Sequence, residues 1–213
     1  MIIKRFTFNF FQENTYVVYD EGGTDCAIID PGCYFPEEER TLIQFLTNNH
    51  LIPSKVLYTH CHLDHAFGAN FLAGEFPSLK FYAHEKEQAN INNAEEQGRL
   101  FGVSLQKPPS ISHYVFEGET IAIGDNSFTV IETPGHSAGG VCYFCKNEKT
   151  LFSGDTLFAG SIGRSDLFGG NGQMLLDSIR TKLMTLPDDV TVYTGHGYPT
   201  TIAEEKHGNP FIP

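Results

Sequence analysis

Residues 59–65 hold four side chains that can bind a metal ion. The segment reads Thr59-His60-Cys61-His62-Leu63-Asp64-His65 and directly follows a predicted short strand over residues 55–58. Imidazole and carboxylate groups together suit zinc, iron or manganese. Residues two apart in an extended segment face the same way, so His60 and His62 can share one ion. Asp64 and His65 lie beyond a bend and can reach a second ion.

Three later segments repeat one arrangement, in which a predicted strand ends beside glycine and a potential ligand. They are Thr133-Pro134-Gly135-His136-Ser137, Phe152-Ser153-Gly154-Asp155-Thr156 and Thr194-Gly195-His196-Gly197. Glycine lets the backbone turn sharply and lets an ion or a substrate approach closely. A lone histidine is more often structural or exposed. Together with segment 59–65, these positions predict one metal centre built from distant strand ends.

The order of predicted elements favours one domain, over residues 1–213, with helices packed outside two sheets. Strands are expected at 2–8, 15–19, 26–29, 55–58, 80–83, 120–123, 127–133, 140–145, 150–153 and 190–194. Helices are expected at 36–49, 84–97 and 172–186, and residues 98–113 are loop-like. No stretch of the sequence has the composition of a linker.

The composition excludes several classes of protein. The chain has 213 residues, of which 40% are hydrophobic, and a formal net charge of −12. Such an acidic chain is a poor partner for nucleic acid, whose binding depends on cationic side chains, and for anionic membrane surfaces. It has no apolar run long enough to cross a membrane and no signal peptide, so we expect a cytoplasmic protein. Five cysteines, an odd number, favour free thiols.

With these residues identified, the sequence resembles the metallo-β-lactamase superfamily. The resemblance rests on the HxHxDH motif at 60–65, followed in family order by His136, Asp155 and His196, and it covers essentially the whole chain. It implies an α/β fold, the four-layer αββα sandwich, with a two-metal site at one edge. It also implies that His60, His62 and His136 hold one ion, that Asp64, His65 and His196 hold the other, and that Asp155 bridges both.

Within the superfamily, the chain is most similar to short members of the glyoxalase II (hydroxyacylglutathione hydrolase) group. Segments 154–158, 160–166 and 195–201 carry this likeness. Common class B β-lactamases place cysteine at the position of Asp155, so we do not expect antibiotic hydrolysis as the main role. Full-length glyoxalase II also has a C-terminal helical domain that binds glutathione, and we do not expect that domain here.

The resemblance also predicts substrate-binding residues. The family places lysine and tyrosine near the thiol substrate at the positions held here by Arg164 and Asp166. Arg164 keeps a cation that can bind a carboxylate, or it can instead pair with Asp166 or Asp155, whereas Asp166 would repel a carboxylate. Tyr198 matches a family tyrosine near the substrate. Arg164 and Tyr198 are therefore the predicted substrate-binding residues.

The function implied is hydrolysis of a small-molecule thioester of the hydroxyacylglutathione or lactoylglutathione type. Two zinc ions, or iron or manganese, would hold a bridging hydroxide. Asp64 would have two roles: it would bind metal, and as the catalytic residue it would orient the hydroxide. The sequence indicates no protein partner.

Three other functions remain open. Iron-dependent persulfide dioxygenases resemble the chain at segments 59–62 and 163–166, and they hold a single iron through equivalents of His60, His136 and Asp155. Hydrolysis of lactones or phosphodiesters is the second, because the same hydroxide can attack other electrophiles. The third is a non-catalytic metal-binding or scaffold protein, against which the complete set of seven ligand-type residues argues.

The cysteines are not expected to bind the metal. Cys61 should point away from its two histidine neighbours in an extended segment. Cys142 and Cys145 are three residues apart on a predicted strand, so they should face opposite sides and form neither a disulfide nor a joint metal site.

Overall fold

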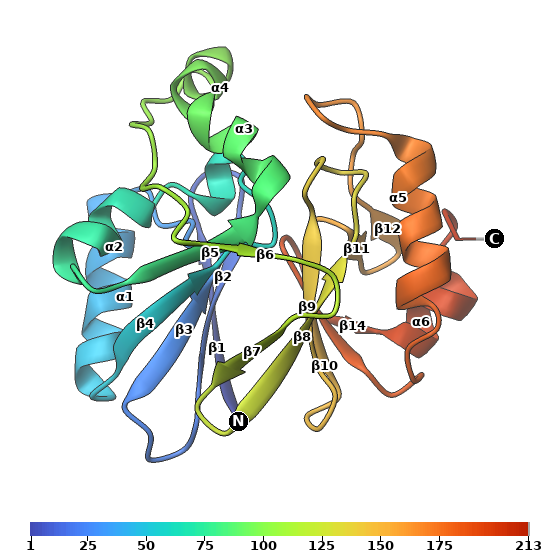
Figure 1. The fold of residues 1–213 in the computed structure, drawn as a ribbon, viewed down its shortest axis with the longest axis horizontal. Coiled ribbons are helices and arrows are strands. Elements are labelled where there is room, and N and C mark those ends of the chain that lie inside the picture. The colour runs from blue at the N-terminus through green and yellow to red at the C-terminus, as the bar shows by residue number, and fades with distance from the viewer. Residues whose placement is uncertain (213) are drawn as a thin grey trace.

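Two six-stranded β-sheets lie face to face between helices in the computed structural model, which describes residues 1–212 (Figure 1). The first sheet has the order β1-β2-β3-β4-β5-β6 and the second the order β14-β13-β10-β9-β8-β7. Helices α1 and α2 cover the outer face of the first sheet, and α5 and α6 cover that of the second. The structure thus confirms the predicted αββα sandwich.

The first sheet changes from antiparallel to parallel at its third strand. Its strands are β1 (Ile2–Phe8), β2 (Glu13–Tyr19), β3 (Asp25–Ile29), β4 (Ile52–Leu57), β5 (Lys80–His84) and β6 (His113–Val115). From β3 to β6 all pairs are parallel. The helices α1 (Pro36–Asn48), α2 (Ala69–Glu75), α3 (Gln88–Asn92) and α4 (Ala94–Phe101) lie in the connections between these strands. Loops that leave the carboxyl ends of these parallel strands therefore meet at one edge.

The second sheet is antiparallel except for one pair, β10 with β13. Its strands are β7 (Thr120–Ile123), β8 (Asn126–Glu132), β9 (Val141–Cys145), β10 (Thr150–Gly154), β13 (Thr191–Thr194) and β14 (Thr200–Thr201). A small hairpin of β11 (Leu157–Phe158) and β12 (Ser161–Ile162) follows β10, and the helices are α5 (Gly172–Ser178) and α6 (Ile202–Gly208).

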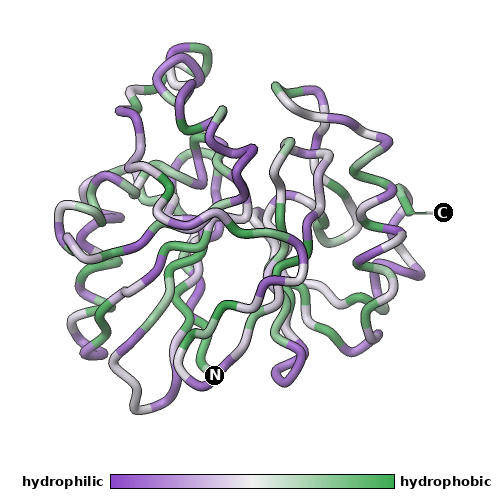
Figure 2. Tube along the Cα trace, viewed as in Figure 1, coloured by the Kyte–Doolittle hydropathy of each residue, from purple (hydrophilic) through white to green (hydrophobic). Residues whose placement is uncertain are grey.

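Three layers of apolar side chains hold the sandwich together. Adjacent strand residues point to opposite faces, so Ile28 packs under the helices of the first sheet while Ile29 packs between the sheets. Cys142 packs under the helices of the second sheet and Cys145 between the sheets, which confirms that they face apart. Figure 2 shows hydrophobic residues concentrated along the central strands and hydrophilic ones in the peripheral helices and turns.

The helix predicted over residues 84–97 is wrong as one continuous element. Strand β5 extends to His84, whose Nδ1 accepts the N–H of Lys86 at 3.2 Å and starts a short 3-10 turn, η2 (Glu85–Glu87). Helices α3 and α4 are separate because Asn93 leaves the helical conformation between them. The predicted loop is shorter than expected, since α4 continues to Phe101 and is terminated by Gly102, which has φ +71°.

Other helices also depart from expectation. The predicted helix 172–186 begins as α5, with the Asn171 side chain accepting the N–H of Met174, but widens into a π turn, η3 (Ile179–Leu183). Helices α2 and α6 were not predicted. Among the described residues, no helix combines the length and the apolar character needed to span a membrane.

Candidate metal centre

The seven predicted ligand residues converge from four loops at strand ends of both sheets. The loop after β4 supplies four of them, and the loop after β8, the end of β10 and the loop after β13 supply one each: His60, His62, Asp64 and His65, then His136, Asp155 and His196. Their ligand atoms form two groups of three, with Asp155 between the groups. The structure therefore brings together residues that are up to 136 positions apart.

The first group consists of His60, His62 and His136. The His136 Nε2 atom lies 2.9 Å from His62 Nδ1 and 3.1 Å from His60 Nε2. All three side chains are buried, and burial together with the neighbouring histidines lowers the pKa of His60 well below its usual range and that of His62 to about 4. Neutral imidazole is the form that binds a metal. These three nitrogens therefore fit one cation.

The second group consists of Asp64, His65 and His196. The Asp64 Oδ2 atom lies 3.3 Å from His196 Nε2 and 3.7 Å from His65 Nε2. Unlike the first group, it has an open side, because the Asp64 and His196 side chains are 15% and 27% exposed. A substrate can therefore reach this group from solvent.

Asp155 faces both groups at once. Its Oδ1 lies 3.4 Å from His65 Nε2, and its Oδ2 lies 3.6 Å from His136 Nε2 and 3.5 Å from His196 Nε2. Burial alone would raise the pKa of Asp155, but the charges of His65 and His196 lower it well below its usual range. Both Asp155 Oδ1 and His65 Nε2 are buried and have no hydrogen-bond partner. Such unpaired buried atoms are costly unless a cation binds them, so this donor set fits bound metal ions.

The second ring nitrogen of several histidines is hydrogen-bonded to oxygen. His65 Nδ1 lies 3.1 Å from Asp30 Oδ2, His136 Nδ1 lies 2.7 Å from the Arg164 carbonyl, and His196 Nδ1 lies 3.1 Å from the Phe11 carbonyl. These oxygens orient each ring and leave its other nitrogen for the metal. Sequence analysis missed Asp30, although the strand-ending Asp30-Pro31-Gly32 resembles the other ligand-bearing strand ends.

The cysteine between the first two ligands is not part of the centre. Cys61 is buried and packs in the layer between the first sheet and its helices. All five cysteines, which lie within the described residues, are free thiols. Both observations agree with the sequence prediction.

The two predicted substrate-binding residues lie at the surface. Arg164 makes a two-pronged ion pair with Asp166, with Nε–Oδ1 at 2.7 Å and Nη2–Oδ2 at 2.8 Å. Its charge is therefore compensated, and its link to the centre is through its backbone carbonyl. Tyr198 is 78% exposed, with its ring 6.0 Å from the Arg5 guanidinium carbon.

A cluster of aromatic rings lies beside the second group. Phe11, whose carbonyl faces His196, stacks with Phe67 at 6.5 Å and meets Phe101 of α4 edge-on at 5.8 Å. Phe10 packs 4.6 Å from Phe11 and is 46% exposed. Apolar rings thus lie beside His196 of the open group, and the Arg5 guanidinium donates to the carbonyl of the next residue, Gly197, at 3.1 Å.

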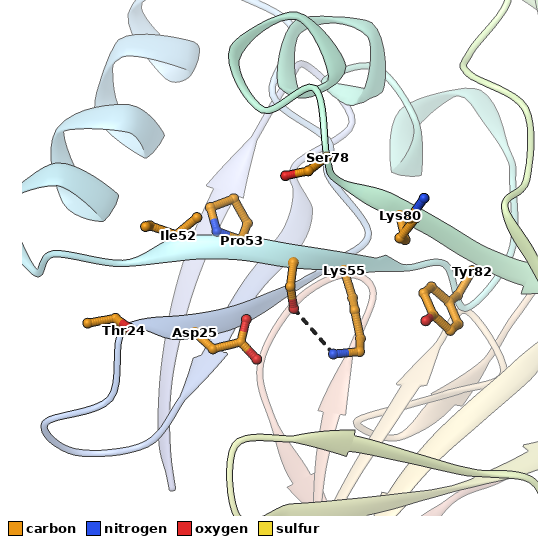
Figure 3. A pocket seen from close by; sticks show the side chains of 9 residues that line it. Thr24, Asp25, Ile52, Pro53, Lys55, Ser78, Lys80 and Tyr82 are labelled. Carbon is orange, nitrogen blue, oxygen red and sulfur yellow. Dashed lines mark hydrogen bonds between the residues drawn. The ribbon is translucent and has the colours of Figure 1, made fainter.

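The cavity drawn in Figure 3 is separate from this centre. It has a volume of about 540 Å³ and is lined by residues at the starts of β3, β4 and β5, including Asp25, Lys55 and Lys80. Four of the ligand-type residues follow the opposite end of β4, and binding sites of parallel sheets usually lie at that edge. Lys55 and Lys80 point away from each other in Figure 3 and do not form a joint anion site.

Comparison with known proteins agrees with this geometry. The family model of the metallo-beta-lactamase superfamily matches residues 8–196, and the chain belongs to this superfamily. It is 36% identical to the hydroxyacylglutathione hydrolase GloC of Haemophilus influenzae, over 95% of the chain and 93% of the relative.

Two solved structures extend the comparison. The BLEG-1 B3 metallo-beta-lactamase has a TM-score of 0.89 at 36% identity and covers 99% of both chains. TTHA1623, solved in a di-iron-bound form, has a TM-score of 0.88 at 34% identity, over 98% of this chain and 100% of the other. The fold, the family and the histidine-rich site together support a hydrolase-like enzyme that binds divalent metal ions.

Proposed function

We propose that the chain is a binuclear metal-dependent hydrolase of thioesters. The observation that carries the proposal is the position of Asp155, whose two carboxylate oxygens face different ligand groups. A carboxylate in this position can bind two ions at once. Zinc is the metal we propose, and the di-iron form of the TTHA1623 relative makes iron the natural comparison.

Two bound cations would supply Lewis acidity, which activates water at neutral pH and polarises a carbonyl group. The chain's own residues would do the rest. His60, His62 and His136 would hold one ion in the buried group, while Asp64, His65 and His196 would hold the other in the open group. Asp64 lies on the open side, where its carboxylate can orient the attacking water toward the thioester carbonyl.

A thioester suits this site for a chemical reason. A thiolate is a stable leaving group, so its departure needs little help from a general acid. The name of the GloC relative, a hydroxyacylglutathione hydrolase, supports the same substrate class. The partner we propose is therefore a small-molecule thioester.

The competing proposal, a single-iron persulfide dioxygenase, uses only His60, His136 and Asp155. It leaves the convergence of Asp64, His65 and His196 within 4.8 Å of one another without a purpose. That second group is the reason to prefer the binuclear hydrolase.

The test measures metal content and thiol release from S-lactoylglutathione on the same zinc-loaded sample. We expect close to two zinc ions per chain and turnover that is lost in His62→Ala. His207→Ala, a substitution of an exposed histidine in α6, is the matched control and should keep full activity. The protein is also prepared with iron. One iron per chain, uptake of oxygen when glutathione persulfide is added, and no thiol release from S-lactoylglutathione with either metal would overturn the proposal in favour of the dioxygenase.

A further inference from the structure

Glu87 is a fully buried carboxylate near the metal centre to which the proposed mechanism gives no role. It lies at the end of η2 with 0% exposure. None of the ion pairs found among residues 1–212 involves it. Burying a carboxylate without a cation is expensive, so its hydrogen bonds must compensate.

Those hydrogen bonds connect the two sheets at the first ligand group. Glu87 Oε2 accepts the backbone N–H of Cys61 at 2.7 Å, and Oε1 accepts that of Gly139 at 2.8 Å. The side-chain amide of Asn90 donates to Oε2 at 2.8 Å. Cys61 lies between His60 and His62 in the loop of the first sheet. Gly139 lies three residues after His136, in the β8–β9 loop of the second sheet.

A side chain at residue 139 would crowd this contact. A Cβ atom there would lie 3.0 Å from Glu87 Oε1 and 2.9 Å from His84 Nδ1, closer than such atoms normally approach. With glycine at position 139, the β8–β9 loop leaves room for the Glu87 carboxylate to reach the backbone N–H of residue 139.

We propose that Glu87 is a positioning residue for the first metal site, because it fixes His60 and His62 at the correct distance from His136. The inference rests on the proposed binding of metal at the two groups. Hydrogen bonds to a charged carboxylate are stronger than neutral ones, and removing the acceptor would leave two buried N–H groups unpaired. The second group has different supports, Asp30 and the Phe11 carbonyl, so it should not depend on Glu87.

The test is Glu87→Gln. Glutamine has one carbonyl oxygen, so it can accept from Cys61 or from Gly139, and its amide would face the other N–H. Metal-free protein is titrated with Co²⁺ against a competing chelator, and the visible absorption of the bound cobalt is followed. We expect the dissociation constant of one of the two ions to rise about 10- to 100-fold, while that of the other changes less than about threefold.

A metal-independent measurement accompanies the titration. In the metal-free variant, the amide protons of Cys61 and Gly139 should exchange with solvent faster than in the unaltered protein. An exchange rate that stays the same at both positions would contradict the proposed contacts.

Glu205→Gln is the matched control. Glu205 is 3% exposed and accepts hydrogen bonds from Gly160, Thr200 and Asn209, but from neither of the two loops that Glu87 joins. We expect this variant to lose thermal stability without changing either dissociation constant. General destabilisation would weaken the binding of both ions equally. If Glu87→Gln does so, or if it weakens the binding of neither ion, the inference is wrong.

Asn90→Ala keeps the test decisive if Glu87→Gln does not fold. It removes one hydrogen bond to the carboxylate and leaves the carboxylate in place, so the same dissociation constant should rise about 2- to 10-fold. No change in that constant would overturn the inference. If the protein binds two ions yet releases no thiol, the proposed substrate is wrong and the inference about Glu87 stands.

Discussion

The Nδ1 atom of His65 lies 3.1 Å from Oδ2 of Asp30, and both side chains are almost completely buried. Asp30 also accepts the N–H of Thr59 at 2.7 Å and its hydroxyl at 2.6 Å. The carboxylate therefore keeps the proton of His65 on Nδ1 and directs Nε2 toward Asp64 and Asp155. One buried acid thus orients a ligand of the open group and anchors the start of the ligand loop.

Asp30→Asn should weaken metal binding at the second group about 10- to 100-fold, because the amide cannot fix His65 as the carboxylate does. Chelator competition on metal-loaded protein measures the change. Asp177→Asn, at an exposed position in α5, is the control and should have no effect. Equal metal retention in Asp30→Asn and the unaltered protein would show that His65 needs no such support.

Asp166→Asn should free the Arg164 guanidinium. We expect KM for a carboxylate-bearing thioester such as S-lactoylglutathione to fall about two- to fivefold, with kcat unchanged, since an exposed charge pair is worth little. An uncharged thioester should show no change, and added salt should reduce the gain. A KM that falls equally for both substrates would mean that charge is not the cause.

Phe101→Ala should raise KM for substrates with an apolar acyl group about three- to tenfold, because Phe101 packs against Phe11 beside the open ligand group. Phe116→Ala removes a phenylalanine that is 60% exposed and follows β6, away from this cluster, so it should leave KM unchanged. Comparable changes in the two variants would argue against an apolar substrate contact at α4.

The thiols should be unreactive in the folded protein. Burial raises the pKa of Cys26 from 9.0 to about 12 and that of Cys142 to about 11. At pH 8, a disulfide reagent should therefore find almost no fast-reacting thiol in native protein and five in denaturant. A rapidly modified thiol in the native state would identify an opening of the core.

The same pKa values predict the direction of alkaline stability. A thiol with a raised pKa in the folded state remains protonated while the unfolded chain ionises. The contribution of the Cys26 thiol to the free energy of unfolding is thus fully present below about pH 9 and is lost as the pH rises through about 12. Urea unfolding at pH 7, 9 and 10.5 should show this decline, and Cys26→Ala should make it shallower. If stability declines with the same slope in both proteins, titratable groups other than Cys26 cause the decline.

Most strands could be predicted from the sequence, as could the seven ligand-type residues that the structure brings together, because their signals are local. Short runs of apolar residues mark most strands, and glycine lies beside His136, Asp155 and His196, where three of these strands end. The continuous helix over 84–97 was wrong because Asn93 and the His84 contact to Lys86 interrupt it. Helices α2 and α6 were missed because each spans only seven residues, too few for a clear periodic pattern.

The supporting residues of the site could not be predicted in the same way. Asp30 meets Thr59 29 positions away, and Glu87 meets Gly139 52 positions away, so only the folded sheets reveal their roles. For Arg164, the sequence could not decide between two roles. Its sequence context permits a substrate contact or an ion pair, and the structure shows the pair with Asp166.

The four ligand-type residues after β4 belong to the first sheet, and His136, Asp155 and His196 belong to the second. Bound ions would therefore act as reversible cross-links between the two halves of the sandwich. Such links stabilise the fold according to the concentration of free metal, by about 2.7 kcal/mol at one hundred times the dissociation constant. The melting temperature of this protein would then depend on metal availability. Scarcity of metal would shorten the lifetime of the folded protein as well as abolish its activity.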